Sequence, residues 1–370
     1  MPRLLHTGDL HLCSPMAAFS PRRAAVRRER QWAALEKTLS DARSAGAELL
    51  LFAGDVFDTP TPPVDAVRRF YGLLADCGLP AVITPGNHDY YRPGGFWDAA
   101  PLPHNVTLFR REQPQTVRFP ALGLSVTGFA FGDENTPAPD LGGAADRDAG
   151  TTNVLLCHAD LLSPLSPYAP LTRGQIEASH FAAALLGHIH NPPPPRRFGE
   201  TVTAYCGFFA GRGFDEPGPG HVNLIDISGL DVRITPVETA ADLFVEETLD
   251  LTGATDGEDV RRRVTDCAEA AKWPEGTALR LHLTGAVSPD CTIDGASICR
   301  IFEALDLFEY RDETLPVLDA GYLEKDPGPK GAFYRAMKDR LSAADPAERA
   351  VAAAALRIGF AALAGREVAL

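Results

Sequence analysis

The fold of this 370-residue chain is decided by residues 48–58, which read ELLLFAGDVFD. The apolar run that ends at Ala53 has the length and composition of a buried β-strand. Gly54 then permits a sharp turn, and the carboxylates of Asp55 and Asp58 follow it. A carboxylate next to a buried strand costs free energy unless it is paired, so it is seldom there for packing. The stretch therefore predicts a sheet with a functional site at the ends of its strands.

Four other short segments place acidic residues, Asn or His after an apolar run in the same way. They are Asp9-Leu10-His11, Gly86-Asn87-His88-Asp89, Cys157-His158 and Gly187-His188-Ile189-His190. These segments hold five of the ten histidines of the chain. A lone Asp-x-His pair is weak evidence for a site. Five segments in order, each after a predicted strand, are typical of a site for two metal ions.

Amphipathic helices are predicted between several of these strands. Residues 22–45 and 64–77 repeat apolar side chains every three or four positions, as a helix with one buried face does. Strands that alternate with helices indicate an α/β protein with a largely parallel sheet.

The pattern changes after the stiff run of prolines at 192–195. Three strand-like stretches follow without helices between them, at residues 201–206, 221–227 and 232–237. We expect these stretches to form an antiparallel set that completes a second sheet.

The sequence predicts three regions, residues 1–240, 241–315 and 316–370. The acidic stretch at 246–259 marks a boundary, and the strand and helix patterns beyond it predict a small α+β domain. The last region is rich in Ala and has a helical period, with four larger side chains at helical spacing, Phe333, Tyr334, Met337 and Leu341. These side chains could cover a core or dock a partner protein, and both interpretations stay open.

The chemistry of the strand-end side chains divides them into two sets that share one carboxylate. Asp9 and His11 are two residues apart, so an extended backbone points both side chains the same way. The two oxygens of Asp55 can bridge two cations. One set is Asp9, His11, Asp55 and His190, and the other is Asp55, Asn87, His158 and His188. Mixed nitrogen and oxygen ligands without thiolate favour Mn²⁺, Fe²⁺ or Zn²⁺ over Ca²⁺ or a closed structural zinc site.

Two divalent ions held side by side activate a water and clamp the oxygens of a phosphate ester, so these sets predict phosphoester hydrolysis. The reaction also needs a group near the leaving oxygen. His88 lies between the ligand Asn87 and Asp89, and we expect it to protonate the leaving group or stabilise the transition state. Asp89 is expected to orient the imidazole of His88, and Asp58 is expected to support a ligand histidine.

Composition restricts the partners and the location of the protein. The net charge is −14, because residues 1–240 hold 20 basic and 25 acidic side chains and residues 241–370 hold 15 and 24. Proteins that grip nucleic acid broadly are basic, so contact with nucleic acid should here be local, metal-assisted or supplied by a partner. The seven cysteines are scattered, and there is neither a signal-peptide pattern nor a long apolar stretch. These features predict a cytoplasmic protein with reduced thiols and no membrane contact.

Several of these segments resemble the calcineurin-like metallophosphoesterase superfamily, and within it the SbcD/Mre11-type DNA repair nucleases. The resemblance lies in His6-Thr7-Gly8-Asp9-Leu10-His11-Leu12, Ala53-Gly54-Asp55-Val56-Phe57-Asp58, Pro85-Gly86-Asn87-His88-Asp89 and Gly187-His188-Ile189-His190. Shorter segments resemble the YhaO-like branch of that group, namely Ser14-Pro15, Tyr205-Cys206-Gly207 and residues 211–216, 355–356 and 364–368. The resemblance is clearest over residues 1–240.

The resemblance implies a four-layer αββα sandwich with metals at the strand mouths, a small α+β capping domain that helps bind DNA, and a C-terminal helical segment. It also implies Mn²⁺-dependent exonuclease and single-strand endonuclease activity in DNA repair, an SbcC/Rad50-like coiled-coil ATPase as partner, and a homodimer. The family's ligand pattern coincides with the two sets above. The family usually has Pro before and Ser after the glycine at 207, where this chain has Cys206 and Phe208.

Three functions are compatible with the sequence. The leading hypothesis is a DNA phosphodiesterase that works with a coiled-coil ATPase. The second hypothesis keeps the chemistry but takes a nucleotide, a cyclic phosphodiester or a phosphoprotein as substrate, which the negative charge favours. The third is a non-enzymatic docking subunit with a vestigial metal site, and the complete ligand set argues against it.

Overall fold

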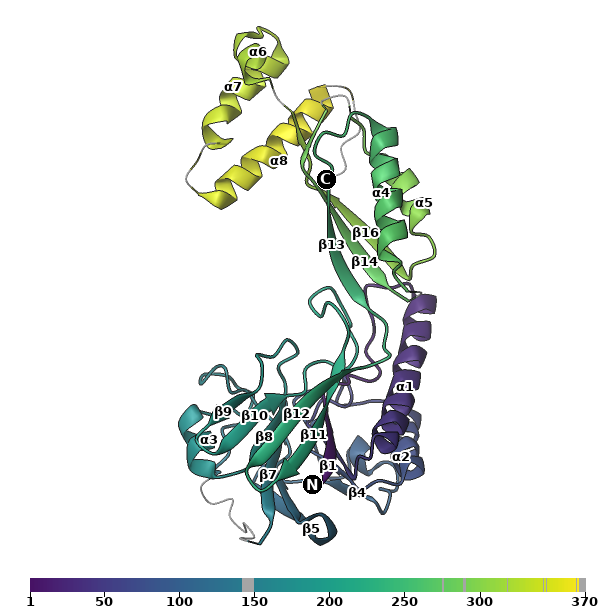
Figure 1. The fold of residues 1–370 in the computed structure, drawn as a ribbon, viewed down its shortest axis with the longest axis vertical. Helices are drawn as coiled ribbons and strands as arrows, with labels where there is room; N and C mark the ends of the chain where they lie inside the picture. Colours follow the sequence, from purple (N-terminus) through teal and green to yellow (C-terminus); the bar gives the residue numbers. More distant parts are fainter. Residues whose placement is uncertain are drawn as a thin grey trace. The chain divides into compact units, whose positions relative to one another are not determined.

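The computed structural model describes residues 1–141, 150–274, 276–288, 291–317, 319–341, 343, 345–363 and 365 (Figure 1). The chain forms two compact units, Met1–Phe244 and Val245–Leu370. The division of the second unit into a capping domain and a separate helical segment stays a prediction.

The first unit contains two six-stranded sheets. The first sheet has the order β12 (Asp231–Glu238), β11 (His221–Ser228), β1 (Arg3–Thr7), β2 (Leu49–Phe52), β3 (Ala81–Ile83) and β4 (Val106–Leu108). The second has the order β5 (Gln115–Phe119), β6 (Leu124–Gly128), β7 (Thr152–His158), β8 (Ala183–Gly187), β10 (Thr201–Tyr205) and β9 (Arg196–Phe198). Strands β1 to β4 are parallel, as are β6, β7, β8 and β10. The predicted α/β class with largely parallel sheet is therefore confirmed.

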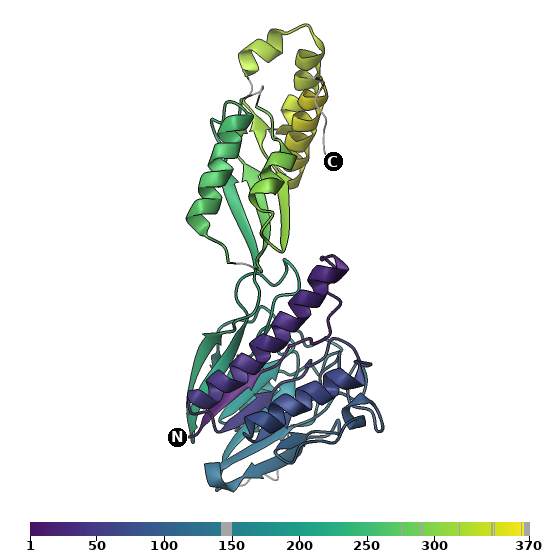
Figure 2. The ribbon, with the colours of Figure 1, turned by 90° about the vertical axis from the view of Figure 1, so that its right-hand side faces the viewer.

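The two sheets pack face to face, and helices cover their outer faces (Figures 1 and 2). Alternate residues of a strand point to opposite faces. Leu50 thus packs in a core with residues of α1 (Pro21–Ser44) and α2 (Val64–Cys77), whereas Leu51 packs between the sheets. Helix α3 (Arg173–Ser179) covers the second sheet. These are the four layers of an αββα sandwich, and short 3₁₀ turns η1 (Phe96–Asp98) and η2 (Pro120–Leu122) lie between strands.

Strands β11 and β12 depart from the sequence prediction. They form an antiparallel hairpin that extends the first sheet, because β11 pairs with β1. The side chains of Arg3 and Asp226 reinforce this pairing with an ion pair of 2.8 Å. Only β10 joins the second sheet, parallel to β8. The antiparallel pairing of β11 with β12 is confirmed, but the prediction that all three stretches complete the second sheet was wrong. Alternation of apolar and polar residues identifies a strand but not the strand with which it pairs.

The parallel strands bring their carboxyl ends to one edge of the sandwich. Strand β1 ends at Thr7, two residues before Asp9, and β2 ends at Phe52, three residues before Asp55. Strand β3 likewise leads to Asn87, β7 ends at His158 and β8 leads to His188. Ligands of open α/β sheets bind outside the carboxyl ends of the strands, so the topology alone gathers the predicted site residues.

The second unit is built on a three-stranded sheet of β13 (Phe244–Asp250), β14 (Ala278–Thr284) and β16 (Leu307–Asp312). Helices α4 (Gly257–Ala271) and α5 (Gly295–Ile301) pack on it through Val260, Val264 and Ile298. This is the order of strands and helices that the sequence predicts for a small α+β domain.

Two short strands and three helices complete the second unit, namely β15 (Ala286–Val287), β17 (Leu315–Pro316), α6 (Ala320–Lys325), α7 (Pro329–Leu341) and α8 (Pro346–Leu363). Leu323, Leu356 and Phe360 form a small core, against which Phe333 and its predicted companions pack. Ala364 and residues 366–368 lie outside the described residues. Among the helices described, none has the length and hydropathy needed to cross a membrane.

Candidate metal centre

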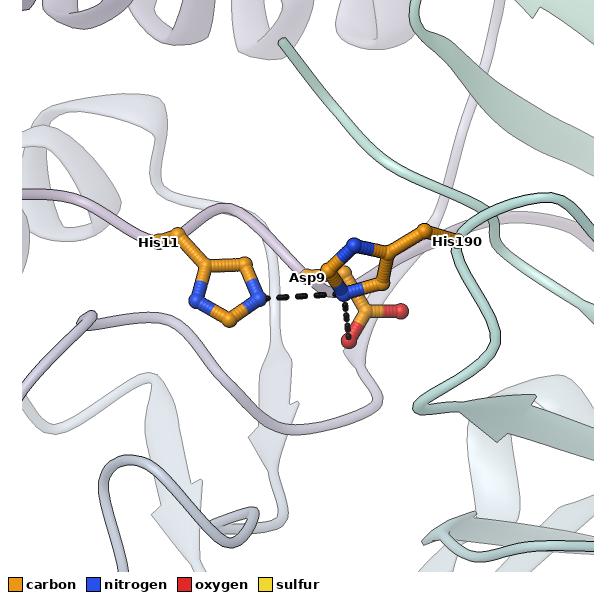
Figure 3. Close-up of side chains that lie close together, drawn as sticks. All are labelled: Asp9, His11 and His190. Atoms are coloured by element: carbon orange, nitrogen blue, oxygen red, sulfur yellow. Dashed lines mark hydrogen bonds and ion pairs between the residues drawn. The ribbon is translucent and has the colours of Figure 1, made fainter. Parts of the chain in front are cut away.

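The strand-end segments converge on one cluster of ligand-type atoms. Asp9, His11 and His190 form one trio, and Asp9, Asp55 and His158 form another, with one ligand-type atom of each residue within 4.8 Å of the others. Figure 3 shows the imidazoles of His11 and His190 pointing toward each other, with the carboxylate of Asp9 beside His190. Residues from both sheets therefore meet at this edge.

Three imidazoles of the cluster are hydrogen-bonded to acceptors through Nδ1, the ring nitrogen that lies on the outer side of the cluster. Nδ1 of His11 lies 2.8 Å from the Asp58 carboxylate, and Nδ1 of His158 lies 3.0 Å from the carbonyl oxygen of Ala53. Nδ1 of His190 lies 2.6 Å from the Glu216 carboxylate. A carboxylate or carbonyl oxygen can only accept, so Nδ1 donates and Nε2 of the neutral ring keeps a lone pair that faces the cluster.

These inward lone pairs fit a bound cation. Nε2 of His11 and Nε2 of His190 lie 3.2 Å apart, so two acceptors face each other unless a cation or a proton lies between them. Nε2 of His158 lies 2.8 Å from Oδ1 of Asn87, where a second pair of acceptors meets. Imidazole nitrogen combined with carboxylate and amide oxygen is a donor set that first-row divalent metals accept.

Asp55 occupies the centre of the cluster. Its Oδ2 lies 3.7 Å from Nε2 of His11 and 3.5 Å from Nε2 of His158, while its Oδ1 accepts from the backbone N–H of His88 at 2.9 Å. Burial raises the pKa of Asp55, but its electrostatic interactions with His158, His11 and His88 outweigh burial and lower the pKa to about 2. The carboxylate is thus ionised at the position from which it could reach both sets of donors.

His188 lies at the side of the cluster, next to His158. The two ring centroids are 5.1 Å apart, and the ring of Tyr168 lies 4.9 Å from that of His188 on a tilted plane. Nε2 of His188 is 4.0 Å from the carboxylate of Asp160, and its backbone N–H donates to Asp9 at 3.0 Å. Burial, followed by the neighbouring His158, lowers the pKa of His188 to about 4. His188 belongs to neither trio, although it borders the one that contains His158.

His88 lies at the solvent side of the cluster. Its side chain is 43% exposed, whereas that of His11 is buried. The two ring centroids are 4.8 Å apart and the rings are perpendicular. Nδ1 of His88 is 3.3 Å from the backbone carbonyl of Asp58. His88 is therefore held in place while one edge of its ring faces solvent.

Asp89 has other partners than the sequence pattern predicts. Its carboxylate is fully buried and accepts from the backbone N–H groups of Gly86 at 2.7 Å, Val56 at 2.8 Å and Phe57 at 3.2 Å. Burial, and then the charge of Asp55, raise the pKa of Asp89 to about 8. Instead of orienting the imidazole of His88, this side chain ties the loop after β2 to the loop after β3. Neighbours in a tight turn point to opposite sides, so adjacency in sequence was a poor guide.

The ligand-type residues have unusual backbone conformations. Asp9 (φ 47°), His11 (φ 45°), Asp55 (φ 49°) and His188 (φ 104°) all have positive φ, which costs free energy for residues other than glycine. Gly54 also has positive φ (89°), and a Cβ there would lie 2.6 Å from the His158 ring. The sharp turn predicted at Gly54 is therefore confirmed, and it brings the backbone close to the ring of His158. The extended backbone predicted for Asp9 and His11 is wrong, because both residues have left-handed conformations.

Arg212 and Glu216 have a place at the centre that sequence reasoning missed. Nη1 of Arg212 lies 2.7 Å from the Asp58 carboxylate, and Nη2 lies 2.8 Å from that of Glu216. One guanidinium therefore joins the two carboxylates that hold His11 and His190. Burial raises the pKa of Glu216, but its hydrogen bonds to His190 and Arg212 outweigh burial and lower the pKa to about 2. The family-like segment at 211–216 was the only signal, and it did not say what these residues touch.

A four-layer αββα sandwich with this donor set at its strand ends defines a metal-dependent phosphoesterase. The sequence profile of the family called "Calcineurin-like phosphoesterase" matches residues 2–192, and the chain belongs to that family. The family uses two divalent metals, which agrees with the donor groups found here.

Several characterised proteins are similar to the chain. It is 30% identical to the DNA double-strand break repair protein Mre11 of Haloferax volcanii, over 72% of this chain and 58% of that protein. It is 28% identical to Mre11 of Halobacterium salinarum, over 72% of this chain and 69% of that protein. It is 30% identical to the SbcD component of the SbcCD nuclease of Bacillus subtilis, over 36% of this chain and 34% of that protein.

The solved structures include TT1561 of Thermus thermophilus, which aligns with a TM-score of 0.42 at 14% identity over 63% of this chain and 98% of that chain. That similarity adds nothing to the assignment.

Proposed function

We propose that this chain is a two-metal phosphodiesterase that cleaves DNA as an exonuclease and endonuclease in DNA repair, together with an SbcC/Rad50-like ATPase. The observation that carries the proposal is the orientation of three imidazoles, those of His11, His158 and His190. The Nδ1 atom of each ring is hydrogen-bonded to an acceptor, and the Nε2 atom faces a side-chain oxygen of Asp9, Asp55 or Asn87. The names of the Mre11 and SbcD relatives support DNA as the substrate.

The proposed ligands of one ion are Asp9, His11, Asp55 and His190, and those of the other are Asp55, Asn87, His158 and His188. A pair of divalent ions supplies a nucleophile from water at neutral pH and offsets the charge of the phosphate. Nitrogen and oxygen donors without thiolate favour Mn²⁺, and Fe²⁺ or Zn²⁺ would also fit them.

The residues around the ligands orient them and handle the leaving group. Asp58 and Glu216 accept from Nδ1 of His11 and His190, which fixes the tautomer and the angle of each ring. His88 is exposed and borders the same cluster, so its imidazole can donate a proton to the leaving oxygen or a hydrogen bond to the transition state. Asp89 acts indirectly, because it ties together the loops that carry Asp55 and His88.

A nuclease assay with the purified chain tests the proposal. We expect degradation of linear and hairpin DNA that requires Mn²⁺, stops with chelator and increases with the ATPase partner. His88→Ala should lower the rate by about 10²- to 10⁴-fold, the usual contribution of a general acid. The matched control is His180→Ala, an exposed histidine that pairs with Glu200 away from the site. Absence of cleavage of every DNA tested, with the partner present, would overturn the nuclease proposal.

A second candidate keeps the chemistry and changes the substrate. The net charge of −14 gives little general attraction for a long polyanion, so a nucleotide, a cyclic phosphodiester or a phosphoprotein could be the substrate. Comparison of kcat/KM on bis-p-nitrophenyl phosphate, cyclic dinucleotides and DNA separates the two proposals. A vestigial site in a docking subunit would be indicated if elemental analysis found no bound metal.

The partner proposal has its own test. Residues 316–370 form α6, α7 and α8 at the end of the chain, and we propose that this region docks the coiled coil of the ATPase. Truncation before Pro329 should then abolish capture of the ATPase while leaving Mn²⁺-dependent hydrolysis of bis-p-nitrophenyl phosphate intact. Retention of the ATPase by the truncated chain would contradict this proposal. The oligomeric state, which we propose to be a homodimer, is measured by light scattering.

A further inference from the structure

A second feature lies at the same edge of the sandwich as the metal centre. It is a groove of about 420 Å³ whose lining includes Tyr91, Arg92, Arg110, Arg111, Phe131 and Gly132. Strand β4 is the neighbour of β3 in the first sheet, and β6 is the neighbour of β7 in the second. The groove therefore occupies the strand ends directly beyond those that lead to Asn87 and His158.

Backbone contacts join the groove to the metal centre. The N–H of Phe131 donates to the carbonyl of Pro85 at 3.2 Å, and the N–H of Tyr91 donates to the carbonyl of Phe131 at 2.7 Å. The rings of Phe131 and His158 are nearly perpendicular, with 5.5 Å between their centroids. The wall of the groove is thus also the support of a ligand histidine and of the segment that carries His88.

The side chains of the groove have the chemistry of a strand-binding surface. Three arginines lie close together in a chain whose net charge is −14. The guanidinium of Arg92 lies 4.7 Å from the Tyr90 ring, and that of Arg110 lies 5.8 Å from the Tyr91 ring. Guanidinium groups that bind phosphate oxygens are typical of surfaces that hold a nucleic-acid backbone, and here two of them lie over a tyrosine ring.

Ion pairs with nearby carboxylates do not explain why the arginines lie in this groove. Arg92 lies 3.3 Å from Asp133, and Arg110 lies 3.6 Å from Asp98. Exposed pairs of this kind contribute little to stability, and a guanidinium with five donors can bind a phosphate as well. Glu112 is the remaining acidic group of the groove, and its carboxylate lies over Gly132.

We propose that this groove binds the phosphodiester backbone of the nucleic-acid strand next to the scissile phosphate. The inference rests on the proposed nuclease function and names the place where that substrate is held. It would give an acidic chain local phosphate contacts, made by guanidinium donors, at the edge where the phosphate is cleaved.

The test compares one long and one small substrate. We expect the triple substitution Arg92→Gln, Arg110→Gln and Arg111→Gln to raise the KM for a single-stranded oligonucleotide by at least about tenfold. The slope of log K against log salt should fall by about 2, at roughly 0.7 per lost phosphate contact. Hydrolysis of bis-p-nitrophenyl phosphate should change by less than about twofold, because that molecule does not extend into the groove. Arg68→Gln is the matched control, since Arg68 is an exposed arginine of α2 paired with Asp65 at 3.0 Å.

The outcomes separate the inference from the proposed function. An unchanged KM and salt slope for the oligonucleotide would overturn the inference and leave the nuclease proposal standing. An equal loss on both substrates would also overturn it, because the arginines would then support the metal centre instead of the strand. Hydrolysis of the small phosphodiester without cleavage of any nucleic acid by the unmodified chain would contradict the nuclease proposal itself.

Discussion

The two halves of the metal centre are held in place by different chemistry. His11 and His190 donate to the carboxylates of Asp58 and Glu216, and Arg212 links those two carboxylates. On the other side, His158 donates to a neutral backbone carbonyl, and the rings of Phe131 and Tyr168 pack against the two histidines there. One half is therefore supported by charge and the other by backbone position and packing.

This difference determines how each half can fail. A charged neighbour raises the basicity of an imidazole and so its affinity for a metal, and its removal weakens a ligand without deleting it. A ring supported by packing is displaced only when the core around it changes, which also alters the free energy of unfolding. The following substitutions separate the two kinds of support.

The largest effect is expected from Asp55→Asn, which acts on both halves at once. An amide has one oxygen acceptor in place of a carboxylate that faces both sets of donors. Loss of metal chemistry removes several kcal/mol of transition-state stabilisation, or about 10³-fold or more in rate. Hydrolysis of bis-p-nitrophenyl phosphate and metal content measure the effect, with Asp65→Asn on the surface of α2 as control. Full metal content together with normal rates would show that Asp55 is not a shared ligand.

Arg212→Gln should weaken only the charged half. We expect Mn²⁺ affinity or activity to fall by about 10- to 100-fold, the usual cost of removing support from a ligand histidine. Arg212→Lys should restore little of it, because an ammonium cannot present the planar fork that contacts both carboxylates. Titration with Mn²⁺ should reveal one binding site with a lowered affinity and one with an unchanged affinity. Equal weakening of both ions would mean that the halves are not independent.

Phe131→Ala should act on the other half, through packing. The ring is fully buried, and its loss should lower the free energy of unfolding by about 3–5 kcal/mol, as urea denaturation would measure. Phe181→Ala is a matched control, because Phe181 is also fully buried in the same core cluster. Both variants should be destabilised, but only Phe131→Ala should lower metal affinity, by less than about tenfold. If the two variants had the same metal affinity, the contact of the Phe131 ring with His158 would not contribute to metal binding.

The smallest effect is expected from Cys206→Ser. The thiol of Cys206 donates to Oδ2 of Asp9 at 3.3 Å, and a hydroxyl can make the same contact. Activity should therefore stay within about threefold of the unmodified chain. Cys206→Ala removes the donor at a volume close to that of serine and should lower Mn²⁺ affinity more than Cys206→Ser does. The reverse order would show that Asp9 does not require the hydrogen bond.

The sequence predicted the residues that converge and one residue that supports them, Asp58, but it did not predict the roles of Arg212 and Glu216. Asp55 could be recognised because a strand, a glycine and a carboxylate follow one another in the chain, and parallel strands bring such ends together. Arg212 lies 154 residues from Asp58, in a loop without periodicity, so no local pattern connects them. The same limit applies to β11, whose partner β1 lies at the other end of the first unit. Asp89 shows a further limit, since its carboxylate binds the backbone of the preceding loop and not the ring beside it in sequence.

The positive φ angles at Asp9, His11, Asp55 and His188 have a consequence for the stability of the protein. Each of these conformations is a free-energy cost that the folded state carries in every condition, and facing lone pairs add to it. A ligand that binds only the folded state offsets such costs by mass action. An ion bound at this site would then add to the stability of the fold as well as to its chemistry. Protein stripped of metal should therefore unfold at a lower urea concentration, and be cut faster by a protease, than protein loaded with it.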